Sequence, residues 1–194
     1  VRFESQQHVG TANITVRLNG GLGNQLFQYA TGKAAALRNS VDLILDTRPL
    51  LSDTLRSYAL HHFDLTGRIA ESEELPPDSS SKLRYGFWRM GREAKERLVR
   101  ERGLNFQGDV LNITPGAILH GYWQSERYFI EFADELRQEI RLKSPPCSQN
   151  KQWLQRIEST PSVSLHVRRG DYVSEKKNQS TFASCSMAYY QKAA

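Results

Sequence analysis

Two adjacent arginines near the end of the chain carry its most specific chemistry. Arg168 and Arg169 follow an apolar run, residues 163–167, that predicts a buried strand, and Gly170 then predicts a turn. Each guanidinium can donate paired hydrogen bonds to phosphate oxygens. Neighbouring cations repel each other, so we expect an anion to be held here, with Asp171 orienting one guanidinium.

Two other interpretations of this motif stay open. Asp171 can form a simple ion pair with one of the two arginines, although that leaves the other arginine unexplained. The tripeptide Arg169-Gly170-Asp171 also occurs in integrin ligands, where it must lie on an exposed extracellular loop.

A glycine turn near the start of the chain is the second candidate. Gly21 and Gly23 allow the backbone to approach a ligand closely, and Asn24 is a good N-cap for the helix that follows. The free N–H groups of a helix N-terminus favour phosphate. The amides of Asn24 and Gln25 are placed to read sugar hydroxyls.

Alternatives to a phosphate site also exist at this turn. A dinucleotide fingerprint, G-x-G-x-x-G, is only partly present because Leu26 occupies its third glycine position, although Asp46 resembles the acid that binds ribose. A tight strand-to-helix turn with no ligand is the simpler interpretation.

A diphosphate held by arginine is typical of sugar-nucleotide chemistry. The leaving nucleoside diphosphate gains negative charge, which fixed guanidinium groups stabilise. The sequence has no D-x-D pair to hold a divalent ion on a diphosphate, and we expect no metal and no bound cofactor. The pair His61-His62 is interpreted as surface or packing histidines.

The positive charge of the chain is concentrated in one segment. The net charge is +5, and residues 82–102 alone carry eight basic and three acidic side chains. This segment predicts a helix with a solvated face. A patch for nucleic acid, an acidic glycan or a membrane surface is the alternative interpretation.

The order of predicted elements indicates an α/β fold. A strand, a helix and a second strand form a βαβ unit, which favours a parallel sheet with a helix on its face. The predicted strands are residues 14–18, 41–46, 116–123 and 162–167, and the predicted helices are 25–38, 126–142 (capped by Ser125), 151–158 and 186–193.

Three blocks of the chain together resemble the α-1,2-fucosyltransferases of bacterial type. They are Asn19-Gly-Gly-Leu-Gly-Asn-Gln-Leu-Phe-Gln-Tyr-Ala30, His120-Gly-Tyr-Trp-Gln-Ser125 and His166-Val-Arg-Arg-Gly-Asp-Tyr172. The resemblance implies an inverting, metal-independent glycosyltransferase of GT-B type. Such an enzyme transfers L-fucose from GDP-L-fucose to a glycan hydroxyl, expected to be O-2 of a terminal galactose.

The resemblance also implies roles for individual residues. Arg168 would contact the donor diphosphate, Arg169 would support it, and His166 would lie beside the donor. The turn from Gly21 to Gln25 would face the donor from the other domain. Asp171 is a possible base, although an arginine anchor is the favoured role, and no other residue stands out as the base.

The family's later blocks, a Ser-Asp-Asp stretch and an Asn-Ser-Thr-Phe-Ser-Trp-Trp block, are absent. We therefore expect a loose leader (1–12), an acceptor-side Rossmann-like domain (13–160) and the truncated start of a second Rossmann-like donor domain (161–194), with little activity from this chain alone. A dinucleotide oxidoreductase and a nucleic-acid-binding module using residues 82–102 remain the alternatives.

The setting is expected to be the cytoplasm, with possible peripheral attachment to the inner membrane face. The two cysteines, Cys147 and Cys185, have no metal-binding spacing and are expected to be reduced. The expected partners are GDP-fucose and a galactose-containing acceptor, and no nucleic acid.

Overall fold

The computed structural model describes residues 13–77, 81–167, 170 and 185–193. These residues form two units, of which the first ends at Ser144 and the second begins at Pro145. The sequence-based domain limits, 1–12, 13–160 and 161–194, stay predictions.

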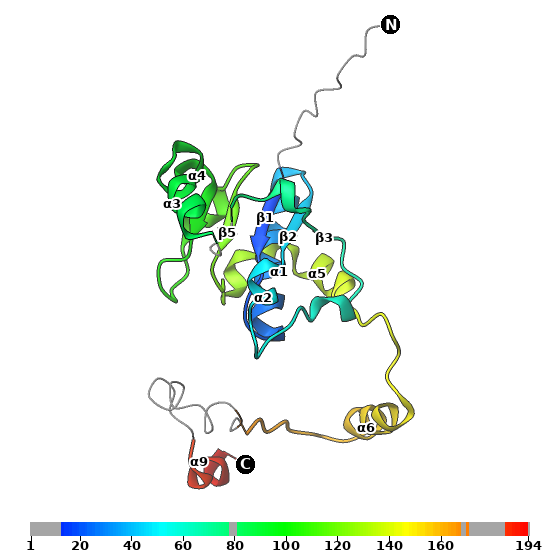
Figure 1. The fold of residues 1–194 in the computed structure, drawn as a ribbon. Helices are drawn as coiled ribbons and strands as arrows, with labels where there is room; N and C mark the ends of the chain where they lie inside the picture. Colours follow the sequence, from blue (N-terminus) through cyan, green and yellow to red (C-terminus); the bar gives the residue numbers. More distant parts are fainter. Residues whose placement is uncertain (1–12, 78–80, 168–169, 171–184, 194) are drawn as a thin grey trace, which may run out of the picture. The chain divides into compact units, whose positions relative to one another are not determined.

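A parallel sheet forms the centre of the first unit (Figure 1). Its strand order is β3-β2-β1-β5-β4, and every pairing between neighbours is parallel. This confirms the α/β class and the parallel sheet. The strands are β1 (Ile14–Arg17), β2 (Leu43–Asp46), β3 (Arg68–Ile69), β4 (Leu98–Arg100) and β5 (Ile118–His120).

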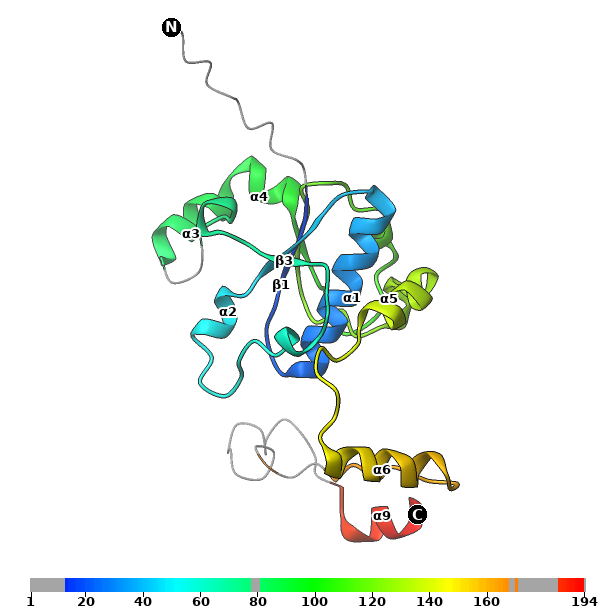
Figure 2. The same cartoon turned by 90° about the vertical axis from the view of Figure 1, so that its right-hand side faces the viewer.

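The central strands are buried on both faces, as strands between helical layers should be. All four residues of β1 and of β2 are buried. Figure 2 shows α1 and α5 on one side of the sheet and α2 and α3 on the other. The helices of this unit are α1 (Leu22–Asn39), α2 (Arg48–Leu51), α3 (Lys82–Met90), α4 (Arg92–Arg97) and α5 (Ala133–Glu139).

Small residues let α1 lie close to the sheet. Ala30, Ala34 and Ala35 are buried, and a Cβ at Gly32 would come within 2.9 Å of the Leu43 side chain. The helix ends at Ser40, which has φ 53 in the left-handed region. This close packing fixes the βαβ unit that the sequence predicts.

Two predicted helices are shorter than expected. The basic segment, residues 82–102, contains two short helices, α3 and α4, and its end forms β4 at the edge of the sheet. Gly91 separates the two helices, and Leu98 and Val99 are partly buried against β5. A buried strand position outweighs the helix propensity of the preceding residues.

The helix expected over 126–142 is also interrupted. The Ser125 hydroxyl accepts a hydrogen bond from the Arg127 N–H, as a cap should, but two 3₁₀ turns follow before the helix α5 begins. The 3₁₀ segments of this unit are η1 (Leu60–His62), η2 (Ser72–Glu74), η3 (Gly108–Asn112), η4 (Glu126–Tyr128) and η5 (Ile130–Phe132).

The second unit contains two described helices, α6 (Ser148–Glu158) and α9 (Met187–Ala193), which confirms the helices predicted near both places. The strand predicted over 162–167 is wrong in this structure, because these residues form no regular element and Val163 is 91% exposed. A strand needs a neighbour to pair with, and no described residue pairs with this segment. Cys147 and Cys185 are exposed free thiols.

Candidate functional site

The carboxyl ends of β1 and β5 lie side by side at the point where the strand order of the sheet reverses. After β1 the chain continues outward to β2 and β3, whereas β4 and β5 lie on the other side. Open parallel sheets bind ligands outside the carboxyl ends of their strands at such a switch point. The glycine turn follows β1, and the block from His120 to Ser125 begins at the last residue of β5. The fold therefore brings these two motifs to one edge of the sheet.

The glycine turn between β1 and α1 is shaped by Gly20. It has φ +75, and a Cβ there would lie 2.4 Å from Nδ2 of Asn24. The predicted N-cap at Asn24 is wrong, because α1 begins at Leu22 and Gly21 is its N-cap without a side-chain hydrogen bond. Asn24 therefore lies in the first turn of the helix. Its side chain does not cap the helix and accepts a hydrogen bond from Gln124.

The side chain of Gln25 holds the turn from inside. It is fully buried, and its Nε2 donates to the carbonyls of Gly20 at 2.8 Å and Ser57 at 2.9 Å. Its Oε1 accepts a hydrogen bond from the Ala59 N–H at 2.9 Å. Because this amide is bonded to backbone, Gln25 positions the turn and the loop that contains Ser57, and it does not present a surface to a ligand.

A second buried glutamine, Gln28, joins the two motifs and was not singled out from the sequence. Its Oε1 accepts from the Asn19 N–H at 3.0 Å, and its Nε2 donates to the Gly121 carbonyl at 2.9 Å. Gln28 is fully buried. The signal in the sequence is a second polar amide about one turn after Gln25, on the side of the helix that carries Ala35 and Gly32.

Asn24 and Gln124 connect the motifs at the surface. The Gln124 Nε2 donates to Oδ1 of Asn24 at 2.7 Å. Together with Gln28, this contact fixes the turn after β5 beside the turn after β1. The two blocks, separated by nearly a hundred residues, form one structural element.

The turn after β5 has an unusual backbone at Trp123. This residue has φ 56, a conformation that bulky side chains adopt rarely, and it is fully buried. The Glu101 carboxylate accepts hydrogen bonds from the Tyr122 N–H at 2.7 Å and the Trp123 N–H at 2.9 Å. Strained residues held in this way concentrate at binding sites and active sites.

A buried ion cluster lies at the ends of β1 and β2. Oδ2 of Asp46 accepts from Nε of Arg17 at 3.0 Å, and Oδ1 accepts from Nε of Arg48 at 2.8 Å. Burial acts to raise the pKa of Asp46, but hydrogen bonds from Arg48 and Arg17 outweigh it and hold the pKa below its ordinary value. Asp46 is 0% exposed, so it is not available to a ribose, which weakens the dinucleotide interpretation.

His120 ends β5 beside this cluster. Burial, together with the positive charges of Arg17 and Arg100, lowers the pKa of His120 to about 4, so the imidazole is neutral at pH 7. Its Nδ1 is buried and has no hydrogen-bond partner among the described residues. A neutral imidazole at this place can exchange a hydrogen bond with a sugar hydroxyl.

A cavity of about 430 Å³ opens at this edge of the sheet. Its polar lining includes an amide, a guanidinium, a carboxylate and an imidazole, and its volume suits a ligand of one or two sugar rings. The lining residues are Asn19, Pro49, Arg100, Glu101, His120, Gly121 and Tyr122.

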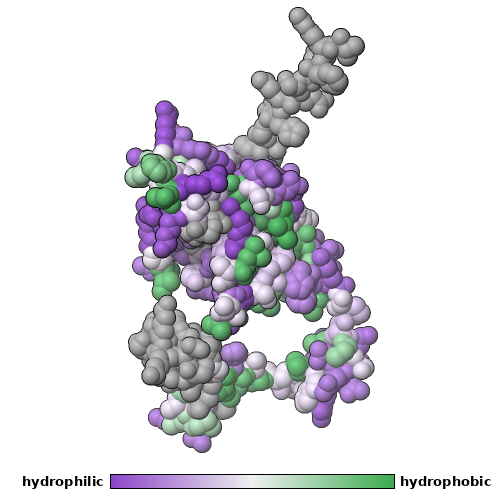
Figure 3. Space-filling model, in the orientation of Figure 1, coloured by the Kyte–Doolittle hydropathy of each residue, from purple (hydrophilic) through white to green (hydrophobic). Residues whose placement is uncertain are grey.

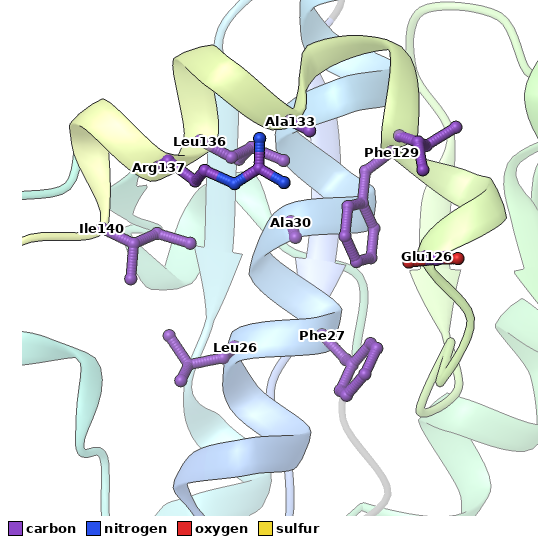
Figure 4. Close-up of a pocket in the computed structure, with 10 residues that line it drawn as sticks. Leu26, Phe27, Ala30, Glu126, Phe129, Ala133, Leu136, Arg137 and Ile140 are labelled. Atoms are coloured by element: carbon purple, nitrogen blue, oxygen red, sulfur yellow. The ribbon is translucent and has the colours of Figure 1, made fainter. Parts of the chain in front are cut away.

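A second cavity, of about 400 Å³, lies between α1 and the segment that leads into α5 (Figure 4). Its walls are almost entirely apolar, with Leu26, Phe27, Phe129, Leu136 and Ile140 turned toward one another. Arg137, at its rim, is ion-paired with Asp134. Polar groups do not converge here, so the cavity is a gap in helix packing and not the candidate site.

The arginine motif is placed only in part. Arg168, Arg169 and Asp171 lie outside the described residues, and their predicted roles stay predictions. His166 is described and exposed, in the second unit. Gly23 is exposed at the start of α1 and has nothing near it, so the turn from Gly21 to Asn24 is open to a ligand.

One family model matches the part of the chain that contains the His120–Ser125 block and the arginine motif. Residues 104–194 match the model of glycosyl transferase family 11. The match includes the turn after β5 and the arginine motif, and it confirms the resemblance drawn from the motifs.

One curated relative matches most of the chain. It is an alpha-1,2-colitosyltransferase of Escherichia coli, 31% identical over 188 residues that include 91% of this chain. The chain spans 61% of the length of that relative. No solved structure matches the chain.

The described residues contain neither a metal-binding cluster nor a membrane-spanning helix. No group of three or more His, Cys, Asp or Glu side chains there could hold a metal ion. Among the described helices, none is long and apolar enough to cross a bilayer. The expectation of a metal-independent reaction stays a prediction.

Proposed function

We propose that the protein is a sugar transferase that moves L-fucose from GDP-L-fucose to a hydroxyl of a glycan, O-2 of a terminal galactose, with inversion and without a metal. The likeness to an alpha-1,2-colitosyltransferase over 91% of the chain carries this proposal. The family 11 match over residues 104–194 supports it. The reaction is placed in the cytoplasm, where free thiols remain reduced.

Residues of two sequence motifs bind the donor. Arg168 binds the diphosphate, Arg169 supports it, and His166 lies beside the donor. The open turn formed by Gly21, Gly23 and Asn24 faces the donor with the free N–H groups of α1. As the bond to the sugar breaks, the leaving GDP gains charge that these donors stabilise.

The acceptor lies in the cavity at the carboxyl edge of the sheet. His120 accepts a hydrogen bond from a sugar hydroxyl through its neutral ring. With a pKa of about 4 it is a weak base, so it orients the hydroxyl, and the hydroxyl proton leaves late in the reaction, to the leaving diphosphate or to water. Asp171 anchors an arginine in this scheme.

The sugar that is transferred needs a direct test, because the named relative transfers colitose. Colitose is L-fucose without its 3-hydroxyl, so the two donors differ by one group. The full-length protein should be incubated with GDP-L-fucose, GDP-colitose or UDP-galactose and a galactoside, with and without EDTA. We expect GDP release and attack of the acceptor hydroxyl on the face of the sugar opposite the leaving GDP, which yields an α-1,2-linked product from GDP-fucose, unaffected by EDTA.

The outcomes separate the alternatives. Turnover of GDP-colitose alone would keep the family chemistry and replace the donor. Turnover of UDP-galactose alone would reject a GDP-linked donor. Reduction of NAD, or binding of RNA with no sugar transfer, would reject the transferase. The dinucleotide oxidoreductase is the weaker candidate because Arg17 and Arg48 already occupy Asp46.

A further inference from the structure

The outer face of α3 is apolar. Leu83, Phe87 and Met90 follow one another at the i, i+4 and i+7 spacing, which places them on one side of the helix. They are 78%, 71% and 68% exposed. Three large apolar side chains in a row on the solvent side of a helix need a partner to be stable in that position.

The opposite face of α3 packs on the body of the first unit. Tyr85 and Trp88 are partly buried with their rings 5.9 Å apart, and the Arg100 side chain donates to the Tyr85 hydroxyl at 3.1 Å. The Arg17 guanidinium lies 5.9 Å from the centre of the Tyr85 ring. These contacts fix the rotation of α3 about its own axis. Its apolar stripe therefore faces solvent, beside the candidate site.

Cations flank the stripe on both sides. Arg84 lies on one side of the helix, and Lys82 and Arg89 lie on the other, as the helical repeat requires. In α4, Arg92 and Arg97 are paired with Glu96 and Glu93. Within the part of the chain that is described, no hydrogen bond or ion pair engages the side chain of Lys82, Arg84, Arg89 or Lys95.

We propose that α3, with the first turn of α4, is a docking surface for an anionic lipid bilayer. The apolar stripe of Leu83, Phe87 and Met90 enters the region between headgroups and acyl chains, and the unpaired cations contact lipid phosphates. Short amphipathic helices with this arrangement lie in the plane of a membrane. The surface in Figure 3 shows hydrophobic residues among strongly hydrophilic ones over this part of the first unit.

Two other occupants fit the surface less well. A second copy would bring two like-charged surfaces together, because residues 82–97 carry six basic and two acidic side chains. Nucleic acid would use the cations but would leave leucine and methionine side chains in water. Only a partner that is both anionic and apolar uses the whole surface.

Vesicle co-flotation tests the proposal, independently of any sugar transfer. The chain is mixed with phosphatidylcholine vesicles, with or without phosphatidylglycerol. We expect binding only to the anionic vesicles. Phe87→Glu should weaken binding at least about tenfold, and so should the combined change Lys82→Gln, Arg84→Gln and Arg89→Gln, because each removes one of the two contributions.

Two control variants make the same kinds of change outside α3. Leu51→Glu changes an equally exposed leucine, and the combined change Arg137→Gln, Lys143→Gln and Lys151→Gln removes three cations. Both should bind like the unchanged chain, and circular dichroism should be the same for all variants. Absence of binding to anionic vesicles, or equal binding by Phe87→Glu, would overturn the proposal. So would salt-sensitive RNA binding that Phe87→Glu leaves intact, when no vesicle is bound.

Discussion

The side-chain amide of Gln28 donates a hydrogen bond to the Gly121 carbonyl at 2.9 Å, inside the first unit. The same amide accepts from the Asn19 N–H at 3.0 Å. One fully buried side chain therefore sets the spacing between the turn after β1 and the turn after β5. The candidate site lies between these two turns, so its shape depends on a residue that touches no ligand.

Replacing Gln28 with leucine should destabilise the protein. The change keeps the volume but leaves the part-buried Asn19 N–H and Gly121 carbonyl without these partners, at a cost of about 1–3 kcal/mol. Urea unfolding followed by circular dichroism measures this cost. Gln138→Leu, at an exposed position of α5, is the control and should stay within about 0.5 kcal/mol of the original. Equal stability of the two variants would refute the role assigned to Gln28.

Two glycines of the same turn should respond in opposite ways to alanine. Gly20→Ala meets Asn24 at 2.4 Å and has φ +75, so we expect a loss of about 1–2 kcal/mol. Gly23→Ala meets nothing within 4 Å inside α1, so we expect a gain of about 0.5–1 kcal/mol. Thermal unfolding compares the two.

Gly23→Ala also tests the donor site. If the donor lies against the backbone of Gly23, this more stable variant should bind GDP more weakly than the original protein. Unchanged GDP affinity would remove Gly23 from the binding residues and leave it as a plain helix position.

Asp46→Asn should remove the charge that Arg17 and Arg48 pair with, and so destabilise the protein. Removing the charge leaves Arg17 buried beside a neutral amide, which costs about 3 kcal/mol at pH 7. The pKa of Asp46 is lowered in the folded protein, so its contribution is complete above the unfolded pKa of about 3.9 and is lost as the pH falls through the folded value. Urea unfolding should therefore show a large difference between the two proteins at pH 7 that shrinks below about pH 4. Asp134→Asn, in an exposed ion pair, should show almost no difference at any pH.

His120 should remain neutral far below the usual range of histidine. Its pKa of about 4 lies under the unfolded value of about 6.5, so the unfolded chain binds more protons between these limits. Stability should therefore fall as the pH drops from about 6.5 toward 4, and His120→Gln should remove part of that fall. Nuclear magnetic resonance of the imidazole proton follows the titration directly. A midpoint near 6.5 in the folded protein would contradict the buried, unpartnered ring.

Much of the fold was readable because the first βαβ unit has strong local signals. Ile14–Arg17 alternates and is rich in β-branched residues, and α1 repeats small residues at helical spacing, so these elements were predicted close to their observed limits. The edge strand Leu98–Arg100 was not predicted, because three residues are too few to show the alternation that identifies a strand. Its place depends on pairing with β5, which is a tertiary contact.

The site was readable as motifs but not as contacts. The glycine turn was identified, yet Gln25 was expected to read a sugar and instead bonds to backbone at Gly20, Ser57 and Ala59. The local pattern cannot tell a buried amide from an exposed one. His120 and Arg17 become candidates only when parallel strands bring their ends together, and Arg17 then binds Asp46.

Calorimetric titration of GDP into the full-length protein tests the central claim most directly, because the proposal depends on a guanidinium that holds the donor diphosphate. The account predicts that GDP binds, that NAD does not, and that Arg168→Ala weakens GDP binding at least about tenfold. Lys151→Ala, which removes an exposed cation of α6, should leave the affinity unchanged. Failure of the unchanged protein to bind GDP, or equal affinity in Arg168→Ala, would contradict it.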